Sequence, residues 1–182
     1  MKWLIASDIH GSAYYCEELF RVFAEEQADR ILLLGDLLYH GPRNRLPENY
    51  DPQRTIALLN AHKNDILCVR GNCDTEVDQM VLEFPIMADY AILTNGTLTV
   101  FATHGHHWHS DHLPPIRPQD ILLHGHTHIP LRAVAPNGVT VLNPGSTTLP
   151  KKDSHHGYMI WENNSFVWKD FDGHTIDILT IR

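Results

Sequence analysis

The sequence predicts an α/β fold, a four-layer α/β/β/α sandwich in which two mixed β-sheets pack face to face with helices outside. Two observations support this. In the first half, short apolar segments alternate with helical segments, which is the βαβ pattern of a parallel sheet. In the second half, apolar segments flank turn-forming residues, as in β-hairpins. At 182 residues the chain is expected to form one domain, residues 1–182.

The first half contains three predicted strands, at residues 2–7, 31–34 and 66–69. Between the first two, apolar residues recur at helical spacing from Cys16 to Ala24, and Ser12 is the expected N-cap. Asp51 and Pro52 predict the start of a second helix that runs to about residue 62. A short helix is expected after the third strand.

The second half contains three predicted hairpins and further short strands. Asn95-Gly96 indicates a two-residue turn between strands at 91–94 and 97–101. The other turns are expected at 136–138 and 162–165, and single strands at 121–123 and 176–181. The two halves together predict two sheets.

Composition argues against several functional classes. The formal net charge of −8 argues against a broad nucleic-acid footprint, because phosphate backbones are held by clustered Lys and Arg. No apolar run approaches the ~20 residues of a membrane span. The apolar start is interrupted at Asp8, so we expect no signal peptide and a cytoplasmic location. The cysteines show neither metal-type nor disulfide-type spacing, and Cys16 and Cys68 are expected in the core.

Polar clusters follow the ends of predicted elements five times. They are Asp8-x-His10, Gly35-Asp36, Gly71-Asn72-Cys73-Asp74, Thr103-His104-Gly105-His106 and Gly125-His126-Thr127-His128. In parallel sheets, active residues gather at the carboxyl ends of the strands. Carboxylate, imidazole and amide oxygen form a ligand set suited to Mn²⁺, Fe²⁺, Zn²⁺ or Ni²⁺.

The two histidines of Gly125-His126-Thr127-His128 have a spacing that suits two metals. In an extended segment His126 and His128 would project from one face, roughly 6.5–7 Å apart. Two metals about 3.5–4 Å apart, each about 2.1 Å from an imidazole nitrogen, span a similar length. For this pair alone, surface histidines on a loop remain the alternative.

Taken in order, these motifs resemble the calcineurin-like metallophosphoesterase superfamily. Within it, Gly71-Asn72-Cys73-Asp74, His40-Gly41-Pro42-Arg43-Asn44 and Asn143-Pro144-Gly145-Ser146 resemble the small bacterial YfcE-like phosphodiesterase group. The motifs extend from residue 7 to about residue 146. The resemblance implies a metallo-dependent phosphatase-like fold and hydrolysis of a small phosphodiester.

The resemblance also implies a ligand set for two divalent metal ions, with Mn²⁺ preferred over Zn²⁺, Fe²⁺ or Ni²⁺. Asp8, His10 and His128 would hold the first ion; Asn72, His104 and His126 would hold the second; and Asp36 would bridge both. A water or hydroxide between the metals would attack phosphorus, because coordination lowers its pKa.

Cys73 departs from the pattern of most superfamily members, which have a histidine at this position that is thought to assist the leaving group. Near two dications the Cys73 thiol could have a lowered pKa and act as a nucleophile or a proton donor, or it could only form a pocket wall. Without the imidazole, activated diesters should be favoured. Asp74 would orient its neighbours, cap the next helix, or both.

Two further residues are candidates for substrate contact. Arg43 could meet a phosphate, or it could be an exposed loop arginine; His106 could contact substrate or support a ligand. Lys151-Lys152 is interpreted as a solvated charge pair. A phosphomonoesterase, a nuclease and a non-catalytic protein-binding scaffold of the same fold are the alternative functions, and a homo-oligomer is left open.

Overall fold

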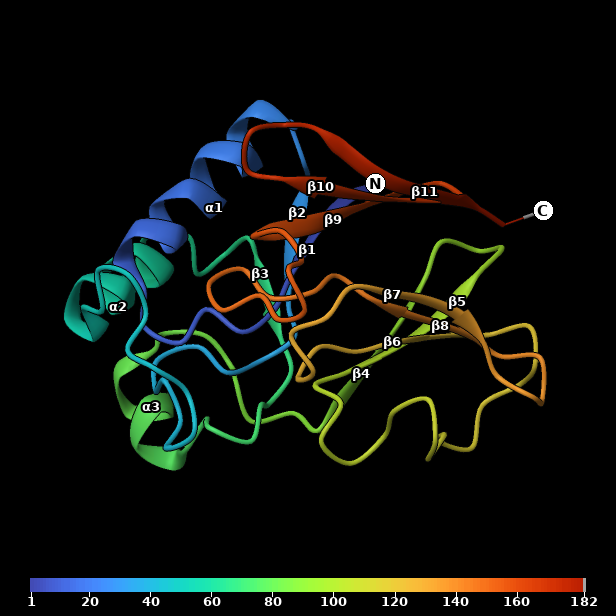
Figure 1. Cartoon of the computed structure of the whole chain (residues 1–182), viewed down its shortest axis with the longest axis horizontal. Coiled ribbons are helices and arrows are strands. Elements are labelled where there is room, and N and C mark those ends of the chain that lie inside the picture. The colour runs from blue at the N-terminus through green and yellow to red at the C-terminus, as the bar shows by residue number, and fades with distance from the viewer. Residues whose placement is uncertain (182) are drawn as a thin grey trace.

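The first of two β-sheets has six strands in the order β11-β10-β9-β1-β2-β3 (Figure 1). The structure is a computed structural model, and it describes residues 1–181. Strands β1, β2 and β3 are parallel, whereas β9, β10 and β11 are antiparallel to their neighbours. The strands are β1 (Lys2–Ala6), β2 (Arg30–Leu33), β3 (Ile66–Cys68), β9 (Gly157–Glu162), β10 (Ser165–Asp170) and β11 (Thr175–Thr180).

The second sheet has five strands in the order β4-β5-β6-β8-β7. Its central strands β5, β6 and β8 are parallel, and the edge strands β4 and β7 are antiparallel. The strands are β4 (Tyr90–Thr94), β5 (Thr99–Thr103), β6 (Ile121–Leu123), β7 (Leu131–Val134) and β8 (Thr140–Asn143). Both sheets are therefore mixed, as predicted.

The two sheets enclose an apolar core. Ile5 and Leu32 of the first sheet pack in one cluster with Val100, Leu123 and Leu142 of the second, and all five are fully buried or nearly so. Alternate residues of β1 and β2 face the other way, as the two-residue period of a strand requires. Burial on both faces explains why these strands read as continuous apolar runs.

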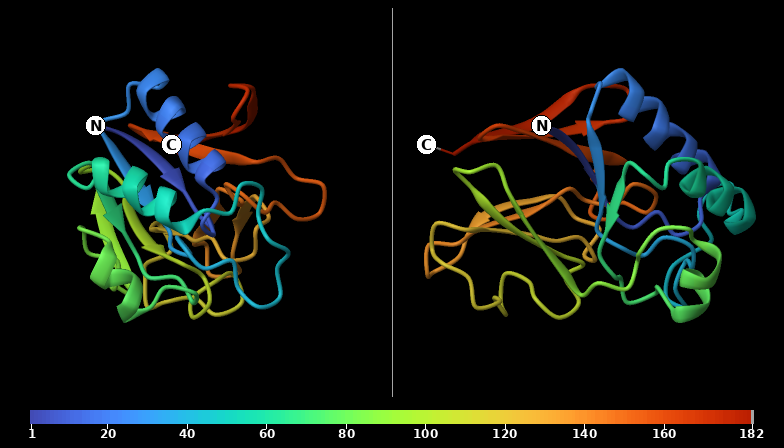
Figure 2. Two further views of the ribbon diagram at one scale, coloured as in Figure 1. Left: turned by 90° about the vertical axis from the view of Figure 1, so that its left-hand side faces the viewer. Right: turned by 180° about the vertical axis from the view of Figure 1, so that it is seen from behind.

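The three helices of the described residues are α1 (Ala13–Glu25), α2 (Pro52–Ala61) and α3 (Glu76–Val81). Helices α1 and α2 lie together on one side of the six-stranded sheet (Figures 1 and 2). Cys16, Leu19 and Phe20 of α1 pack against Leu4 and Ile31. None of the helices within residues 1–181 is long and apolar enough to cross a membrane.

The outer face of the second sheet packs against a loop segment, whereas that of the first sheet packs against helices. Phe101 and Leu122 pack there against Trp108, Leu113 and Ile116 of the segment 104–120. The predicted α/β fold with two mixed sheets is confirmed. The helical layer expected outside the second sheet is wrong, because the segment 104–120 covers that face as a loop.

Helix starts follow the sequence signals. The Ser12 hydroxyl accepts a hydrogen bond from Tyr15 N at 3.3 Å, and Asp51 accepts one from Arg54 N at 3.0 Å with Pro52 in the first turn. Each side chain satisfies a backbone donor that the helix leaves free. Both predicted caps are confirmed.

One local expectation is wrong, and one of the two roles considered for Asp74 is excluded. The turn at Asn95-Gly96 spans residues 95–98, because the Asn95 side chain accepts from Thr97 N and Leu98 N and holds a wider loop before β5. Thr75, not Asp74, caps α3 through a capping box with Asp78. The Asp74 carboxylate has other backbone donors, which are described below.

Candidate metal centre

Three buried side chains form the first cluster of the site, and they come from segments far apart in sequence. Asp8 and His10 follow β1, and His128 follows β6. Asp8 Oδ1 lies 3.3 Å from His128 Nε2 and 3.7 Å from His10 Nε2. The two Nε2 atoms are 3.3 Å apart. One cation placed among these three atoms would be within reach of all of them.

A second cluster lies beside the first. His104, after β5, has its Nε2 atom 3.1 Å from Asn72 Oδ1 and 3.1 Å from His126 Nδ1. Asn72 follows β3, and His126 follows β6. The carboxyl ends of parallel strands from both sheets therefore supply the two clusters, as the sequence predicts.

Asp36, directly after β2, lies between the clusters. Its Oδ2 atom is 3.8 Å from His10 Nε2 and 3.5 Å from His104 Nε2. Its Oδ1 atom accepts a hydrogen bond from Cys73 N at 2.8 Å, which fixes the carboxylate. One carboxylate oxygen thus faces both clusters.

Three of the imidazole rings are oriented by backbone carbonyls. In each ring Nδ1 lies 2.7 Å from a carbonyl oxygen and donates to it; the pairs are His10 with Tyr39, His104 with Leu34 and His128 with Leu149. A proton on Nδ1 leaves Nε2 of a neutral imidazole unprotonated and aimed at the cluster. Metal-ligating histidines are usually held in this way.

Five of the predicted ligands have left-handed backbone conformations. Their φ angles are 61° at Asp8, 51° at His10, 57° at Asp36, 66° at His126 and 62° at His128. Such conformations of non-glycine residues cost about 1–3 kcal/mol each and concentrate at functional sites.

The extended geometry expected for His126 and His128 is wrong, because β6 ends at Leu123 and both residues are left-handed. The structure nevertheless brings His128 to the first cluster and His126 to the second. The left-handed turn of the backbone, and not the two-residue repeat of a strand, directs the two imidazole rings to different clusters.

Two glycines allow the ligand turns to approach each other. A Cβ added at Gly125 would lie 1.9 Å from Ser7 Oγ and 3.0 Å from Asp8 Oδ2. A Cβ at Gly71 would lie 2.1 Å from Asp36 Oδ1. Side chains at these positions would displace the carboxylates of both clusters.

The electrostatics favour metal-binding protonation states in most of the groups. Burial opposes ionisation of Asp8, but the imidazoles of His128, His104 and His10 outweigh it and lower the pKa of Asp8. Burial lowers the pKa of His10, and it lowers that of His126 to about 4. These three groups are thus ready to donate to a cation without first losing a proton.

His104 is the exception. Burial alone would lower its pKa, but Asp36 and Asp8 outweigh burial and raise the pKa of His104 to about 9. A cation between Asp36 and His104 would compete with this proton for both groups.

Comparison with known proteins agrees with this arrangement. The domain described as the calcineurin-like phosphoesterase superfamily domain matches residues 1–165. The chain belongs to the calcineurin-like phosphoesterase superfamily. Phosphodiesterase YfcE from Escherichia coli strain K12 is 42% identical to it over 164 residues, which cover 90% of this chain and 89% of the relative. The resemblance inferred from the motifs is confirmed.

Solved structures extend the comparison. The structure of YfcE, a phosphoesterase from E. coli, matches this calcineurin-like phosphoesterase with a TM-score of 0.95 and 38% identity, over 100% of both chains. An archaeal phosphodiesterase matches with a TM-score of 0.61 and 19% identity over 100% of both chains. Vacuolar protein sorting 29 from Cryptosporidium parvum has the same TM-score and identity, over 99% of this chain and 98% of that one. The last two share the fold.

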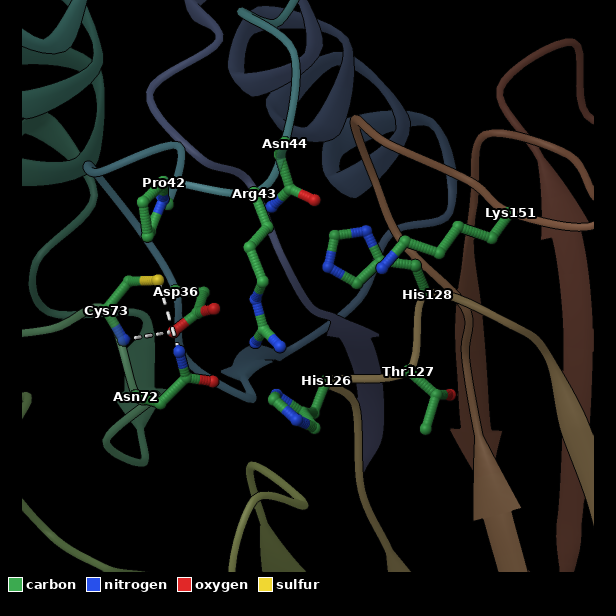
Figure 3. Close-up of a pocket in the computed structure, with 11 residues that line it drawn as sticks. Asp36, Pro42, Arg43, Asn44, Asn72, Cys73, His126, Thr127, His128 and Lys151 are labelled. Atoms are coloured by element: carbon green, nitrogen blue, oxygen red, sulfur yellow. Dashed lines mark hydrogen bonds between the residues drawn. The ribbon is translucent and has the colours of Figure 1, made fainter.

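A cavity of about 400 Å³ opens onto the centre of this calcineurin-like phosphoesterase (Figure 3). Its lining includes the predicted site residues Asp36, Arg43, Asn72, Cys73, His126 and His128, together with Gly41, Pro42, Asn44, Thr127 and Lys151. The predicted substrate residue Arg43 thus faces the same space as the ligands. His106 does not; it lines a neighbouring cavity of about 370 Å³ on the other side of His126.

Cys73 forms part of the cavity wall. Its thiol accepts a hydrogen bond from Asn72 Nδ2 at 3.3 Å and is 9% exposed. Among the protein's own groups, burial and then the Asp36 carboxylate raise the pKa of Cys73 and favour the thiol. A thiolate would therefore depend on nearby cations.

Asp74 lies behind the ligands rather than in the cavity. Its carboxylate accepts hydrogen bonds from Asp36 N at 2.8 Å, Leu37 N at 2.9 Å and Gly71 N at 2.7 Å. Burial and the nearby Asp36 raise the pKa of Asp74 to about 6, against the effect of these bonds. The side chain joins the turn after β2 to the turn after β3.

Lys151, Asn44 and Thr127 also line the cavity, and the sequence does not predict them as site residues. The sequence predicts Lys151 only as part of a solvated charge pair. Its backbone N donates to His128 O at 3.0 Å, which places it beside a ligand that is 23 positions away in sequence. No local sequence signal reports such a contact.

Proposed function

We propose that this chain is a dinuclear-metal phosphodiesterase that hydrolyses a small phosphodiester. The observation that carries the proposal is the position of Asp36 Oδ2, 3.8 Å from His10 Nε2 and 3.5 Å from His104 Nε2, between two clusters that each converge on a point. Its relative YfcE is named a phosphodiesterase. The proposal assigns Asp8, His10 and His128 to one ion, Asn72, His104 and His126 to the other, and Asp36 to both.

The residues fit such a pair of ions. Asp8 Oδ1 is fully buried and has no hydrogen-bond partner, although an ionised carboxylate oxygen in that position needs a counter-charge. The donors are carboxylate, imidazole and amide oxygen, without thiolate pairs, which suits Mn²⁺ first and Zn²⁺, Fe²⁺ or Ni²⁺ as alternatives. Two cations held here would lower the pKa of a coordinated water and attract the phosphoryl oxygens.

The chain's own residues would then position the substrate. Arg43 reaches into the cavity from the loop after β2, where it would meet an anionic part of the substrate (Figure 3). Asp74 is assigned a positioning role, because its three hydrogen bonds hold the backbone around Asp36 and Gly71. His106 would support His104 and His126, which its ring adjoins.

Cys73 determines how good a leaving group the substrate must have. The Cys73 thiol borders the cavity at the position where most members of the superfamily have a histidine, so this position offers no imidazole to protonate a leaving group. An alkoxide leaving group needs a proton in the transition state, whereas a nitrophenolate does not. We therefore assign a preference for activated diesters to this site.

The size and charge of the site favour a small substrate over a nucleic acid. The cavity of about 400 Å³ is in the range of small-molecule sites, and the chain has a net charge of −8. Its three cysteines are free, which supports the cytoplasmic location that we also propose.

The test is a hydrolysis screen under Mn²⁺, Zn²⁺, Fe²⁺ and Ni²⁺, with bis-(4-nitrophenyl) phosphate and 4-nitrophenyl phosphate as the diester and the monoester. We expect faster turnover of the diester with at least one metal. Faster turnover of the monoester would assign the site to a phosphomonoesterase. Turnover of neither ester with any metal would support the scaffold alternative.

Asp36→Asn supplies the matched variant. Asparagine keeps an oxygen for the Cys73 N–H but loses the charge, so we expect diester hydrolysis to fall by at least a hundredfold, a loss typical of groups that stabilise transition-state charge. Asp65→Asn, at an exposed aspartate beside His62, is the control and should keep the parent rate. Full activity of Asp36→Asn would refute the two-metal assignment.

A further inference from the structure

Two cationic side chains without partners enter the cavity above the metal centre. Arg43 extends from the loop after β2 toward the space between Asn72 and His126, and Lys151 extends toward His128 (Figure 3). Both residues line the same cavity of about 400 Å³. They come from separate loops, so their convergence is a property of the fold rather than of one sequence motif.

Both loops are attached to predicted metal ligands. The loop that carries Arg43 is bound to His10 through Tyr39 O, which accepts from Nδ1 at 2.7 Å, and Asn44 Nδ2 closes it by donating to His40 O at 2.8 Å. The loop that carries Lys151 is bound to His128 on both sides. Leu149 O accepts from His128 Nδ1 at 2.7 Å, and Lys151 N donates to His128 O at 3.0 Å. The backbones of both cations are thus fixed relative to the centre.

Most other cations within residues 1–181 have carboxylate or carbonyl partners, the exceptions being Arg45, Arg117 and Lys152. Arg54 pairs with Glu17, Arg132 with Asp177, and Lys169 with Glu26. Within residues 1–181, the side chains of Arg43 and Lys151 take part in no ion pair and no hydrogen bond. In a chain with 22 acidic residues and a net charge of −8, two unpaired cations in one cavity are available to an anionic ligand.

A simple phosphodiester does not need these charges. Resting on the proposed function, two divalent cations already balance the charges of Asp8, Asp36, a coordinated hydroxide and a singly charged phosphodiester. Arg43 and Lys151 add two further positive charges at the cavity wall. These two charges are therefore free to bind an anion other than the reacting phosphate.

We propose that Arg43 and Lys151 form a subsite for a second anionic group of the substrate, so that the substrate is a phosphodiester whose alcohol part carries a carboxylate or a further phosphate. The guanidinium offers a planar pair of donors and the ammonium a compact charge, and both groups bind carboxylate and phosphate oxygens. The metal centre holds the reacting phosphate, and the subsite selects the alcohol.

The experiment uses three 4-nitrophenyl alkyl phosphodiesters that differ only in the end of the alkyl chain, which is a carboxylate, an uncharged amide or a trimethylammonium group. The metal-loaded parent should have a kcat/KM about tenfold higher for the carboxylate than for the amide, from a factor of two to five for each exposed cation. The preference should fall as salt concentration rises. Equal rates, or a preference for the trimethylammonium ester, would overturn the subsite.

Two neighbouring cations provide matched controls. Arg43→Gln and Lys151→Gln should each reduce the carboxylate-to-amide ratio by two- to fivefold, and Lys151→Glu should raise the rate of the trimethylammonium ester relative to the amide. Lys152→Gln and Arg45→Gln, which remove cations that do not line this cavity, should keep the parent ratio. Equal losses in the control variants, or losses shared equally by all three esters, would contradict the proposal.

A binding measurement separates this inference from catalysis. Calorimetric titration with two unreactive phosphonate monoesters, one with a carboxylate tail and one with an amide tail, should give tighter binding of the first in the parent and not in Lys151→Gln. Equal affinities in the parent would refute the subsite. If the amide diester is hydrolysed but the ratio is one, only the subsite fails; if no diester is hydrolysed, the proposed function fails.

Discussion

Gly125 is the position at which the smallest change should disturb the ligand turns most. The Gly125→Ala side chain would lie 1.9 Å from Ser7 Oγ and 2.7 Å from Ser7 Cβ. Contacts of Cβ atoms below 3.0 Å are essentially absent from real proteins, so the Ser7 hydroxyl or the His126 turn must move by about 1 Å. Ser7 is 1% exposed, which leaves no solvent space for that movement.

The expected size of the effect follows from this overlap. Overpacking of one methyl group into a tightly packed region costs about 1–3 kcal/mol of unfolding free energy. The same methyl lies 3.0 Å from Asp8 Oδ2, which accepts the hydrogen bond of His126 N at 3.1 Å. We therefore expect a loss of about 2–3 kcal/mol in the chelated protein and weaker metal binding in addition.

A double-mutant cycle with Ser7→Gly isolates the contact. Removing Ser7 Oγ and Cβ vacates the space that the new methyl needs, so the double variant should be more stable than the sum of the two single effects by at least about 1 kcal/mol. Urea unfolding followed by tryptophan fluorescence measures each corner of the cycle. Gly173→Ala is the control, because its Cβ meets nothing within 4 Å, and it should show no coupling to Ser7→Gly. Additive effects of Ser7→Gly and Gly125→Ala would refute the steric reasoning.

Three further predictions concern the whole molecule and two side chains. Removal of the metal ions by a chelator should lower Tm by about 10–20 °C. Two cations at a hundredfold excess over Kd each contribute about 2.7 kcal/mol of unfolding free energy, and 1 kcal/mol corresponds to about 2–4 °C in a chain of this size. A calorimetric shift of Tm below 3 °C would contradict this prediction. The parent should hydrolyse a nitrophenyl diester at least a hundredfold faster than a matched alkyl diester, and Cys73→Ser should keep that ratio within about threefold, since neither side chain supplies an imidazole to protonate an alkoxide. A larger change in the ratio would make Cys73 the proton donor. Burial opposes ionisation of Glu26, but Lys169 and Lys2 outweigh burial and lower the pKa of Glu26 below 4.5. The ionised carboxylate therefore stabilises the fold above pH 4.5, and this stabilisation is lost as pH falls through the lowered pKa. Glu26→Gln should thus cost about 1–2 kcal/mol at pH 7 in urea unfolding, and this cost should decline as pH is lowered from 4.5 through the lowered pKa of Glu26; a cost that does not change with pH would contradict the ion pairing.

Local patterns were sufficient for most of the fold. The apolar strands and the caps at Ser12 and Asp51 depend on residues within a few positions, and the structure reproduces them. The sequence leaves the role of Asp74 open between a cap of α3 and a support for its neighbours, because Asp74 and Thr75 are both good N-cap residues. Only the tertiary structure shows that the Asp74 carboxylate is already occupied by three backbone donors from two other turns.

The ligand candidates could be predicted because each follows a strand, and parallel strands bring their ends together. The backbone conformations of these candidate ligands could not be predicted. Asp8 and His128 are left-handed because tertiary contacts override the local preference of non-glycine residues, so a strand-based spacing failed for His126 and His128. The carbonyls that orient the rings leave no trace in sequence, since every residue has one.

The position of Lys151 in the cavity could not be predicted from the sequence either. Its role depends on a backbone contact with His128 and on a cavity shared with Arg43, neither of which a local pattern encodes. Lys151, Lys152 and Asp153 are all exposed, so the local sequence predicts only a solvated segment.

The central claim is that one carboxylate, Asp36, joins two metal ions. Electron paramagnetic resonance of the protein during stepwise addition of Mn²⁺ tests this claim most directly, because two Mn²⁺ ions that share a carboxylate are magnetically coupled. We predict a spin-coupled signal that grows to completion at two equivalents in the parent and is absent from Asp36→Asn. The signal of isolated Mn²⁺ at every loading of the parent would contradict the shared centre.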